Sequence, residues 1–360
     1  MHKVILKLIF ENDLKANHFK ALDGLRGIAI LFVLLSHSSN ASVFIHKNLN
    51  FQGIGNMGVY LFFVLSAYLL DRQIAIAFIT KKSSKQYWMN YILRRFLRIY
   101  PLFAIALISY GILTYYGHKT VIDKLIDVPL HLALVRGEGV FWSIPVELKY
   151  YIISPLIMLI CHKYLKWYSK KVIYFFLSVI FVLIMIESIF NLPNISTLKY
   201  IPIFLTGTFF SVIELLHKKS FKQKKFSKII EIVGLISIGL ILIVTFGFFK
   251  HTFSGYFNFR NSVFYLPFAI FWVVILIASK YGLGIIKHFL EIKWIRFLGT
   301  ISFSVYLIHK PILFAVNNEH FGISSNLKIY VFFIVTILLS TLSFLLIEKP
   351  LSKIRIGYQE

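Results

Sequence analysis

The sequence contains very little cysteine and few charged residues for its length. Cys161 is the only cysteine in 360 residues, so no disulfide can form within the chain. Charged residues make up 15% of the chain, whereas a globular domain carries about 25%. Hydrophobic residues make up 58%, and the mean hydropathy is +0.75. This composition excludes a disulfide scaffold, a disordered chain and a water-soluble surface, and it predicts an all-α, polytopic helical membrane protein.

Acidic residues are much rarer than basic ones. The chain has 15 Asp and Glu against 39 Lys and Arg, which gives a formal net charge of +24. A basic excess can indicate nucleic-acid binding, but it also arises when Lys and Arg collect in the cytoplasmic loops of a membrane protein. The positions of these residues along the chain therefore decide between the two interpretations.

Ten apolar stretches approach the length that a membrane-spanning helix needs, about 20 residues. They cover residues 24–45, 54–79, 96–116, 143–161, 172–190, 200–216, 229–249, 262–279, 297–315 and 327–347. The loops between them are short and leave no room for a soluble domain of about 50 residues. Any chemistry must therefore lie inside the helical bundle or at its two faces.

The basic residues are distributed unevenly between the two sets of loops. If the N-terminus is cytoplasmic, the loops on that side hold 27 Lys and Arg, and the opposite loops hold 7. This asymmetry predicts that both termini are cytoplasmic and that the Lys-rich loop 218–228 meets anionic membrane lipid, and it argues against nucleic-acid binding. We expect a cytoplasmic amphipathic segment without a cleavable signal at 1–20, a membrane-embedded domain at 21–348 and a cytoplasmic tail at 349–360.

Two ionisable residues lie in the first apolar stretch. An ionisable side chain at membrane depth costs about 2.5–3.5 kcal/mol, which makes it a candidate for function. Arg26 and His37 are eleven residues apart, close to three helical turns, so they face the same way about 16 Å apart along the axis. A neutral imidazole can act as a general base near pH 7. The alternative is a buried histidine held by a helix–helix hydrogen bond, and the aligned arginine favours the functional interpretation.

Three arginines, Arg94, Arg95 and Arg98, open the third apolar stretch at the predicted cytoplasmic interface. Arg95 and Arg98 share a helix face. Guanidinium groups bind phosphate through two parallel hydrogen bonds, so a phosphorylated cofactor from the cytoplasm is a natural partner. Anchoring by the positive-inside rule explains the same residues equally well.

Two further polar residues interrupt apolar stretches. Glu147 lies about one turn into the fourth stretch, predicted at its outer end, where it can orient an imidazole, bind sugar hydroxyls or pair with Lys149. His309 lies two residues before Pro311, which frees backbone groups in a membrane helix. The alternative for His309 is a hydrogen-bonded histidine at a proline kink. No histidine or cysteine spacing is typical of a metal site, so no metal is predicted.

An ordered set of motifs resembles the acyltransferase-3 family of integral membrane O-acyltransferases. These motifs are Leu22–Gly27 with His37, Gly58–Tyr68, Arg94–Pro101, Trp142 and Ser143 with Glu147, Ser302–Pro311, and the ending Glu348–Pro350. Ala67 replaces a glycine of the second motif, and Pro145 and Lys149 are less typical of the fourth. Many members of the family carry an additional C-terminal hydrolase-like domain, whereas this sequence resembles the stand-alone type.

The resemblance implies transfer of an acyl group, most commonly acetyl, from cytoplasmic acyl-CoA to a hydroxyl of a surface polysaccharide or its lipid-linked precursor, in a bacterial inner membrane. It implies that Arg94, Arg95 and Arg98 bind the CoA phosphates. His37 is then a general base or a transient acyl carrier, assisted by Arg26 and Glu147, with the arginines and His37 at different depths of one pore. The implied acceptor pocket contains Ser66, Tyr68, Trp142, Ser143, Tyr306 and His309.

Other functions remain open from the sequence. Buried His, Arg and Glu in ten spans also suit a proton-coupled transporter or a flippase, although the sequence shows no internal repeat. A requirement for acyl-CoA would distinguish the enzyme from a carrier. Within the same family, the acyl group can instead be succinyl, and the acceptor can be peptidoglycan, a lipid or a small metabolite.

Overall fold

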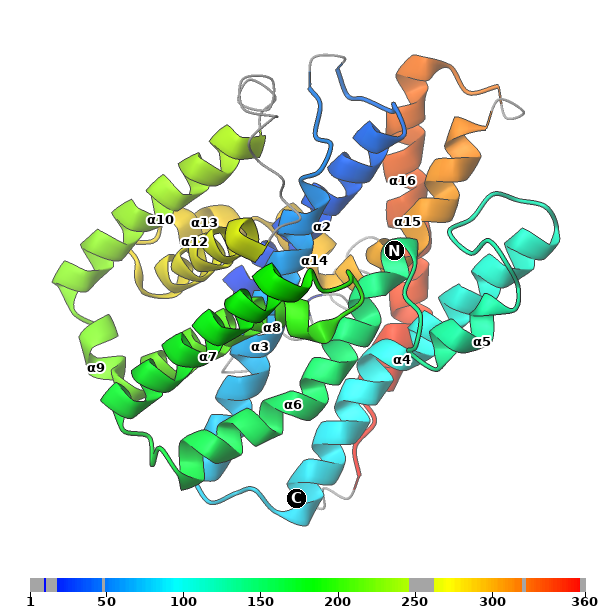
Figure 1. The fold of residues 1–360 in the computed structure, drawn as a ribbon. Coiled ribbons are helices and arrows are strands. Elements are labelled where there is room, and N and C mark those ends of the chain that lie inside the picture. The colour runs from blue at the N-terminus through cyan, green and yellow to red at the C-terminus, as the bar shows by residue number, and fades with distance from the viewer. Residues whose placement is uncertain (1–9, 11–17, 47–48, 246–261, 319–321, 357–360) are drawn as a thin grey trace.

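The computed structural model describes Phe10 and residues 18–46, 49–245, 262–318 and 322–356. In these ranges it contains helices and no strands, which confirms the all-α prediction (Figure 1). Most of the predicted amphipathic segment 1–20 lies outside the described residues. The elements are α2 (Lys20–Asn40), α3 (Gly55–Ile79), α4 (Lys85–Tyr115), α5 (Asp127–Leu132), η2 (Gly139–Trp142), α6 (Ser143–Lys163), α7 (Ser169–Phe190), α8 (Thr197–Leu216), α9 (Lys218–Phe221), α10 (Lys224–Thr245), α12 (Ser262–Tyr281), α13 (Ile285–Leu290), α14 (Lys293–Thr300), α15 (Ser302–Asn317), α16 (Ser325–Ser343), the π-helix η4 (Phe344–Glu348) and α17 (Lys349–Ser352).

Nine of the ten predicted stretches each coincide with one helix, and the tenth, 297–315, covers parts of α14 and α15. Within the described ranges, eight helical segments are long and apolar enough: α2, α3, α4, η2 with α6, α7, α8, α10, and α16 continued through η4 into α17. A ninth forms only if α14 and α15, which meet at an angle of 77°, count as one span. Helix α12, which corresponds to the predicted stretch 262–279, has 20 residues. The prediction of one continuous span at 297–315 is therefore wrong.

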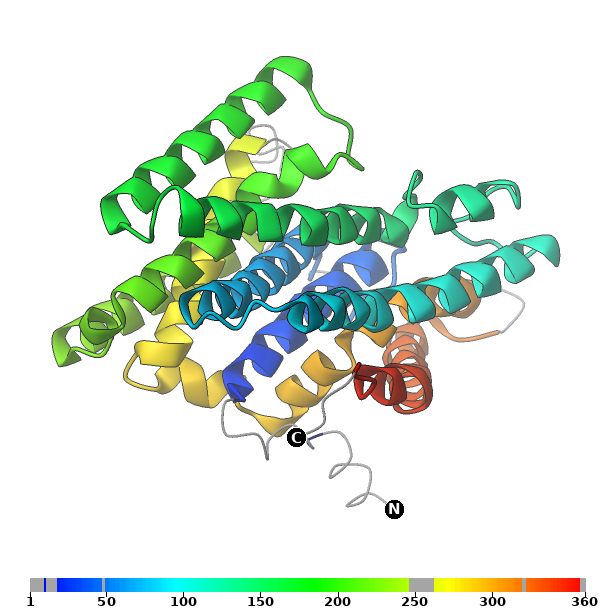
Figure 2. The ribbon, with the colours of Figure 1, turned by 90° about the horizontal axis from the view of Figure 1, so that it is seen from below.

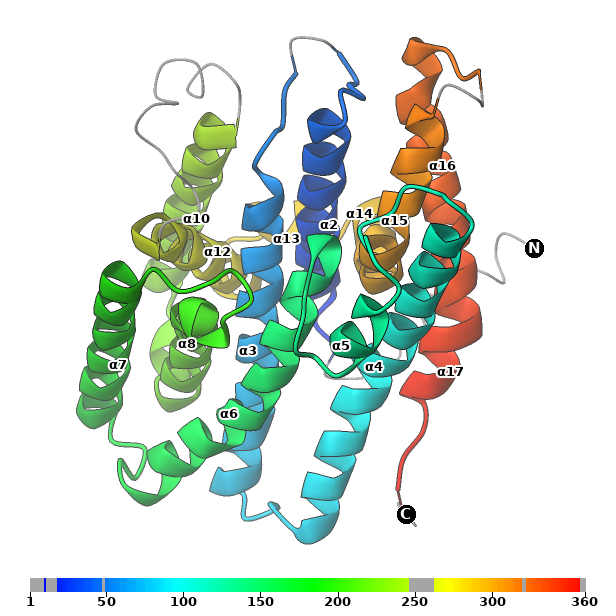
Figure 3. The same cartoon turned by 45° about the vertical axis from the view of Figure 1, so that its right-hand side comes forward.

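The helices alternate in direction through the bundle, as the charge pattern predicts. Figure 3 shows the α3–α4 and α6–α7 connections at one end of the bundle and the C-terminal ends of α2 and α15 at the other. We call the first the basic end, because its connections belong to the Lys- and Arg-rich set, and the second the opposite end. That the basic end faces the cytoplasm remains a prediction from the charge distribution.

Helices α2 and α3 form the centre of the molecule. Figure 2 shows them between α6–α8 on one side and α13–α15 on the other. A Cβ atom on Gly27 would overlap the backbone carbonyl oxygen of Ile295, and one on Gly299 would overlap that of Asp23. Small residues allow helix backbones to touch in this way. The contact lays α14 against α2, so the chain must bend sharply before it can continue as α15.

A buried carboxylate ties three helices together. Asp71 of α3 is completely buried and accepts hydrogen bonds from the hydroxyls of Tyr150 and Ser154 on α6 and Thr208 on α8. A buried carboxylate is costly unless it is hydrogen-bonded in this way. The cluster fixes α3 against α6, the two helices that carry Ser66 and Glu147.

Candidate active site

A cavity with a solvent-accessible volume of about 80 Å³ lies between α2, α3, α4, α6 and α15, and we call it the arginine cavity. It is lined by Arg26, Val59, Phe62, Phe63, Leu65, Ser66, Arg98, Ile99, Ser143, Ile144, Glu147, Ser302, Phe303 and Tyr306. Six of these were predicted as site residues from the sequence: Arg26, Ser66, Arg98, Ser143, Glu147 and Tyr306. The fold therefore brings polar residues of five separate motifs to one cavity.

Glu147 is held by two hydroxyl groups in this cavity. Its Oε1 accepts hydrogen bonds from Ser66 Oγ at 2.5 Å and from Tyr151 OH at 2.5 Å, and these two hydroxyl oxygens are 3.0 Å apart. Tyr151 lies one turn after Glu147 on the same helix face. Because this spacing is visible in the sequence, it is a signal that would have identified Tyr151 as a site residue.

The depth predicted for Glu147 is wrong. Ser66 lies near the middle of α3, so its partner Glu147 lies at mid-depth and not at the outer end of a span. Glu147 lies at this depth because the segment between α4 and α6 runs back along α4. Its Leu132 carbonyl accepts a hydrogen bond from Tyr100, midway along α4, at 3.1 Å. Helix α6 therefore begins inside the bundle.

Arginine side chains give the cavity an excess of positive charge. Arg26 Nη1 lies 3.3 Å from the carboxylate of Asp23, but Arg26 is also within electrostatic range of Arg95 and Arg98. Arg98 is exposed and lines the cavity. The Arg95 guanidinium lies 5.7 Å from the Tyr151 ring centre, and its buried Nε has no hydrogen-bond partner. An anionic ligand would relieve the repulsion between these guanidinium groups and satisfy their donors.

Helices α2 and α15 bring two histidines together. His37 Nδ1 lies 2.6 Å from His309 Nε2, and the two rings are nearly parallel at 10° with centres 4.9 Å apart. His309 Nδ1 lies 3.1 Å from the Val305 carbonyl oxygen, which can only accept. These partners assign the hydrogen to Nδ1 of His309 and make its Nε2 the acceptor, so His37 Nδ1 donates. His37 Nε2 then keeps its lone pair and can accept a proton.

A second cavity opens beside His37 at the opposite end of the bundle, and we call it the lysine cavity. It has a solvent-accessible volume of about 420 Å³ and is lined by His37, Asn40, Ala41, Lys119, Lys310, Leu313, Phe314, Asn317 and Asn318. His37 and Arg26 therefore line two different cavities. Tyr306 lines the arginine cavity, and its ring centre is 6.2 Å from that of His309. Tyr306, His309 and His37 thus form a continuous row from one cavity to the other.

Pro311 lies inside α15, two residues after His309. Pro311 has no N–H, so it leaves the carbonyl of Leu307, four residues earlier, without its helical partner. The hydroxyl of Tyr110, a buried residue of α4, donates to this carbonyl at 2.8 Å. No pattern in the sequence identifies Tyr110, because its role depends on how α4 packs against α15.

Three of the predicted site residues lie elsewhere. Trp142 lines a third cavity, with a solvent-accessible volume of about 270 Å³, together with Tyr60 and Tyr200. Tyr68 donates a hydrogen bond to Glu214 and accepts one from Lys280 Nζ at 3.1 Å, so it links α3 to α8 and α12. Arg94 does not line the arginine cavity, and its Nε donates to the Asn90 carbonyl at 3.1 Å.

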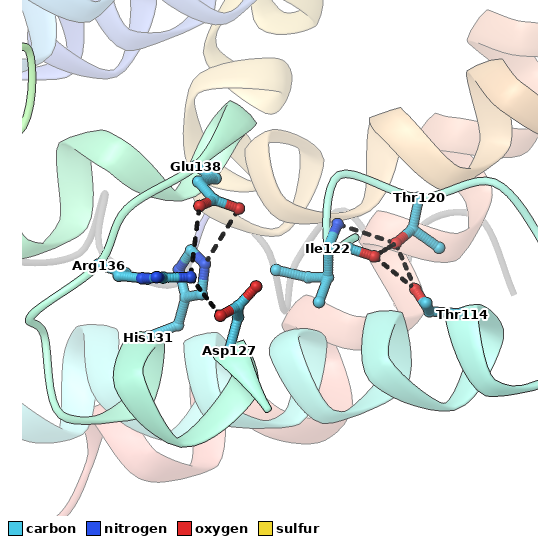
Figure 4. A network of polar contacts seen from close by, with 7 residues as sticks. All are labelled: Thr114, Thr120, Ile122, Asp127, His131, Arg136 and Glu138. Atoms are coloured by element: carbon cyan, nitrogen blue, oxygen red, sulfur yellow. Dashed lines mark hydrogen bonds and ion pairs between the residues drawn. The ribbon is translucent and has the colours of Figure 1, made fainter. Parts of the chain in front are cut away.

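Polar contacts also stabilise the chain between α4 and α6 (Figure 4). Thr114 Oγ1 contacts Thr120 Oγ1 at 2.7 Å and the Ile122 carbonyl oxygen at 2.9 Å. Farther along, Arg136 forms an ion pair with Asp127, and the buried His131 lies 3.8 Å from Glu138. Burial lowers the pKa of His131, which favours its neutral form. These contacts fix the segment that places Lys119 and η2.

The described part of the chain contains no group of three or more His, Cys, Asp or Glu side chains that could hold a metal ion. The arginine cavity offers guanidinium and carboxylate groups, and the lysine cavity offers imidazole and ammonium groups. The cationic groups can bind an anionic ligand, and His37 Nε2 can accept a proton.

Comparison with known proteins gives a consistent result. Residues 19–347 match a family described as an acyltransferase domain. The chain is 22% identical to the peptidoglycan O-acetyltransferase OatA of Listeria monocytogenes over 92% of its own length and 56% of that protein. It is 22% identical to the O-acetyltransferase OatA of Staphylococcus aureus over 93% of its own length and 57% of that protein. The chain thus spans somewhat more than half the length of these relatives.

No solved structure matches the chain. The family match nevertheless covers nearly all of the helices described above, including every residue that lines the arginine cavity and the lysine cavity. The chain is therefore a member of the acyltransferase-3 family of integral membrane acyltransferases.

Proposed function

We propose that this chain is an O-acetyltransferase of the bacterial cytoplasmic membrane that transfers acetyl from acetyl-CoA to a hydroxyl of a cell-surface glycan. The observation that carries the proposal is the hydrogen-bonded pair of His37 and His309 between the arginine cavity and the lysine cavity. The names of the relatives favour acetyl over succinyl and peptidoglycan as the glycan.

The arginine cavity is the proposed donor site. CoA carries several phosphates, and Arg98 offers an exposed guanidinium at the cavity while Arg95 has an unpartnered buried Nε one turn away. Two guanidinium groups spaced in this way suit phosphate recognition. Arg26, deeper in the bundle, would bind the CoA moiety and so direct its thioester toward His37, which lies about 16 Å farther along the same helix.

The lysine cavity is the proposed acceptor site. In the simplest reaction, His37 Nε2 takes the proton of the acceptor hydroxyl while the hydroxyl oxygen attacks the thioester carbonyl carbon. The carbon–sulfur bond then breaks, and the CoA thiolate leaves with the proton carried by His37. The same lone pair also suits the alternative, in which His37 first accepts the acetyl group and then passes it to the hydroxyl. In both cases the hydrogen bond to His309 keeps Nε2 free of hydrogen.

Glu147 and its hydroxyl partners have a supporting role in this proposal. The carboxylate lies in the arginine cavity and not on the acceptor side, and it holds Ser66 and Tyr151 in one cluster beneath Arg95. It therefore orients the tyrosine ring on which the Arg95 guanidinium packs. Ser143 is hydrogen-bonded to Tyr306 at 2.9 Å, which fixes the first residue of the row that leads to His37.

Transfer of labelled acetyl tests the proposal directly. Membranes that contain the protein should incorporate acetyl from isotopically labelled acetyl-CoA into the surface glycan as an alkali-labile ester, because an O-acetyl ester is hydrolysed by base. Mass spectrometry of the glycan should show an acetyl-sized increment in cells with the gene and none in the deletion strain. A larger mass increment would show that the enzyme transfers another acyl group. A phenotype that does not require acyl-CoA would favour a transporter.

Arg98 provides a separate prediction about the donor. Arg98→Ala should raise the KM for acetyl-CoA by about 10- to 100-fold, because a charge-assisted hydrogen bond is worth about 1.5–3 kcal/mol. The KM for the acceptor should stay within about twofold. Lys85→Ala removes the same charge from the first residue of the same helix, where the side chain is exposed, and serves as the control. An unchanged KM for acetyl-CoA in Arg98→Ala would remove Arg98 from the donor site.

A further inference from the structure

Two lysines from distant parts of the chain line the lysine cavity beside His37. Lys119 comes from the segment between α4 and α5, and Lys310 comes from α15, next to His309. Both ammonium groups pack on one aromatic ring: Lys119 Nζ lies 5.9 Å and Lys310 Nζ lies 5.8 Å from the ring centre of Phe314. Two positive charges therefore meet around a single ring at the edge of this cavity.

Neither lysine has an acidic partner among the residues that the structure describes. The residues that line the cavity include no Asp or Glu, and the remaining polar groups there are His37 and three asparagines. Like charges gathered without a counter-ion raise the local positive potential, and walls of low dielectric constant strengthen it. The cavity is thus complementary to an anion next to the imidazole that would meet the acceptor.

Neighbouring contacts hold the backbone beside both lysines. Lys119 directly precedes Thr120, which is buried and hydrogen-bonded to Thr114 and to the backbone of Ile122 (Figure 4). Lys310 lies in the part of α15 where the Tyr110 hydroxyl donates a hydrogen bond to the Leu307 carbonyl. Because their backbones are anchored, these lysines resemble the parts of a binding site more than mobile surface charges.

We propose that Lys119 and Lys310 bind an anionic group of the acceptor, a carboxylate or a phosphate, so that the acceptor is an acidic glycan and not a neutral sugar. This inference rests on the proposed function, since it takes His37 as the residue that meets the acceptor hydroxyl. Membrane phospholipid headgroups offer the same anionic chemistry, so the test must separate the two sources.

The test uses the full-length protein in lipid nanodiscs and a matched pair of probes. N-acetylmuramic acid and its methyl ester carry the same hydroxyls and differ by one negative charge. Calorimetry gives the Kd of each probe, and acetyl transfer from labelled acetyl-CoA is measured in parallel. The wild-type protein should bind the acid about tenfold more tightly than the ester, as expected for a charge-assisted contact.

Charge-removing variants locate the contact. Lys119→Gln together with Lys310→Gln should bind the acid and the ester equally, and each single variant should retain part of the preference. Lys124→Gln, at an exposed position of the same segment, should keep the full preference. The thermal unfolding temperature of each variant, compared with that of the wild-type protein, shows that the lost preference is not a loss of fold.

The outcomes separate the inference from the proposed function. Equal Kd values for the two probes in the wild-type protein, or a preference that survives in the double variant, would overturn the inference even if acetyl transfer is observed. A charge preference without acetyl transfer would support the anion site and contradict the proposed function. A preference that is present in phosphatidylcholine discs and disappears when phosphatidylglycerol is added would assign the cavity to lipid headgroups and overturn the inference.

Discussion

Replacing His37 with alanine should lower acetyl transfer by about a thousand-fold, within the range that general acid–base catalysis supplies. The reason is the position of its Nε2, which is the unprotonated ring nitrogen at the lysine cavity once Nδ1 donates to His309. Alanine removes that nitrogen and leaves the arginine cavity unchanged, since His37 does not line it. The kcat for transfer from labelled acetyl-CoA should therefore fall, while the Kd for acetyl-CoA should change by less than about twofold.

His118→Ala is the matched control for this variant, because His118 is exposed and lines neither the arginine cavity nor the lysine cavity. A His37→Ala protein that keeps a tenth of the wild-type rate would show that His37 does not carry the proton. Incubation with acetyl-CoA in the absence of acceptor distinguishes the two roles of His37. An acyl carrier would gain the mass of one acetyl group on a peptide containing His37, whereas a general base would not.

The sequence alone predicts the helices well, because the physics of spanning a bilayer is local. A run of about 20 apolar residues satisfies its own backbone hydrogen bonds as a helix, whatever surrounds it. The bend between α14 and α15 could not be predicted in this way. It depends on Gly299 meeting the backbone of Asp23 on α2, a contact between residues far apart in the sequence.

For the candidate site too, the sequence identifies individual residues but not the contacts between distant parts of the chain. Arg26, Ser66, Glu147 and Tyr306 could be singled out because polar groups in apolar helices are costly, or because they lie in motifs of the family, and the structure brings all four to one cavity. The pairing of His37 with His309 joins residues 272 positions apart, so no local pattern reveals it. The predicted depth of Glu147 was wrong for a related reason, because the return of the chain along α4 is a tertiary feature.

His309 provides the second large expected effect. His309→Phe removes the acceptor for His37 Nδ1–H, so the hydrogen is no longer held on Nδ1 and the lone pair is no longer held at Nε2. Loss of a group that orients a catalytic histidine lowers kcat substantially, and we expect a decrease of about 100-fold or more. The KM for acetyl-CoA should stay within about twofold, because His309 lines neither the arginine cavity nor the lysine cavity.

His309→Gln separates orientation from packing. The glutamine amide oxygen can accept the hydrogen bond that His309 Nε2 accepts, so this variant should recover activity to within about tenfold of the wild-type rate. A phenylalanine variant as active as the glutamine variant would mean that His309 only fills space between α2 and α15. If glutamine restores activity and phenylalanine does not, the acceptor atom itself is required, and the tautomer of His37 is then set by the Val305 carbonyl through His309.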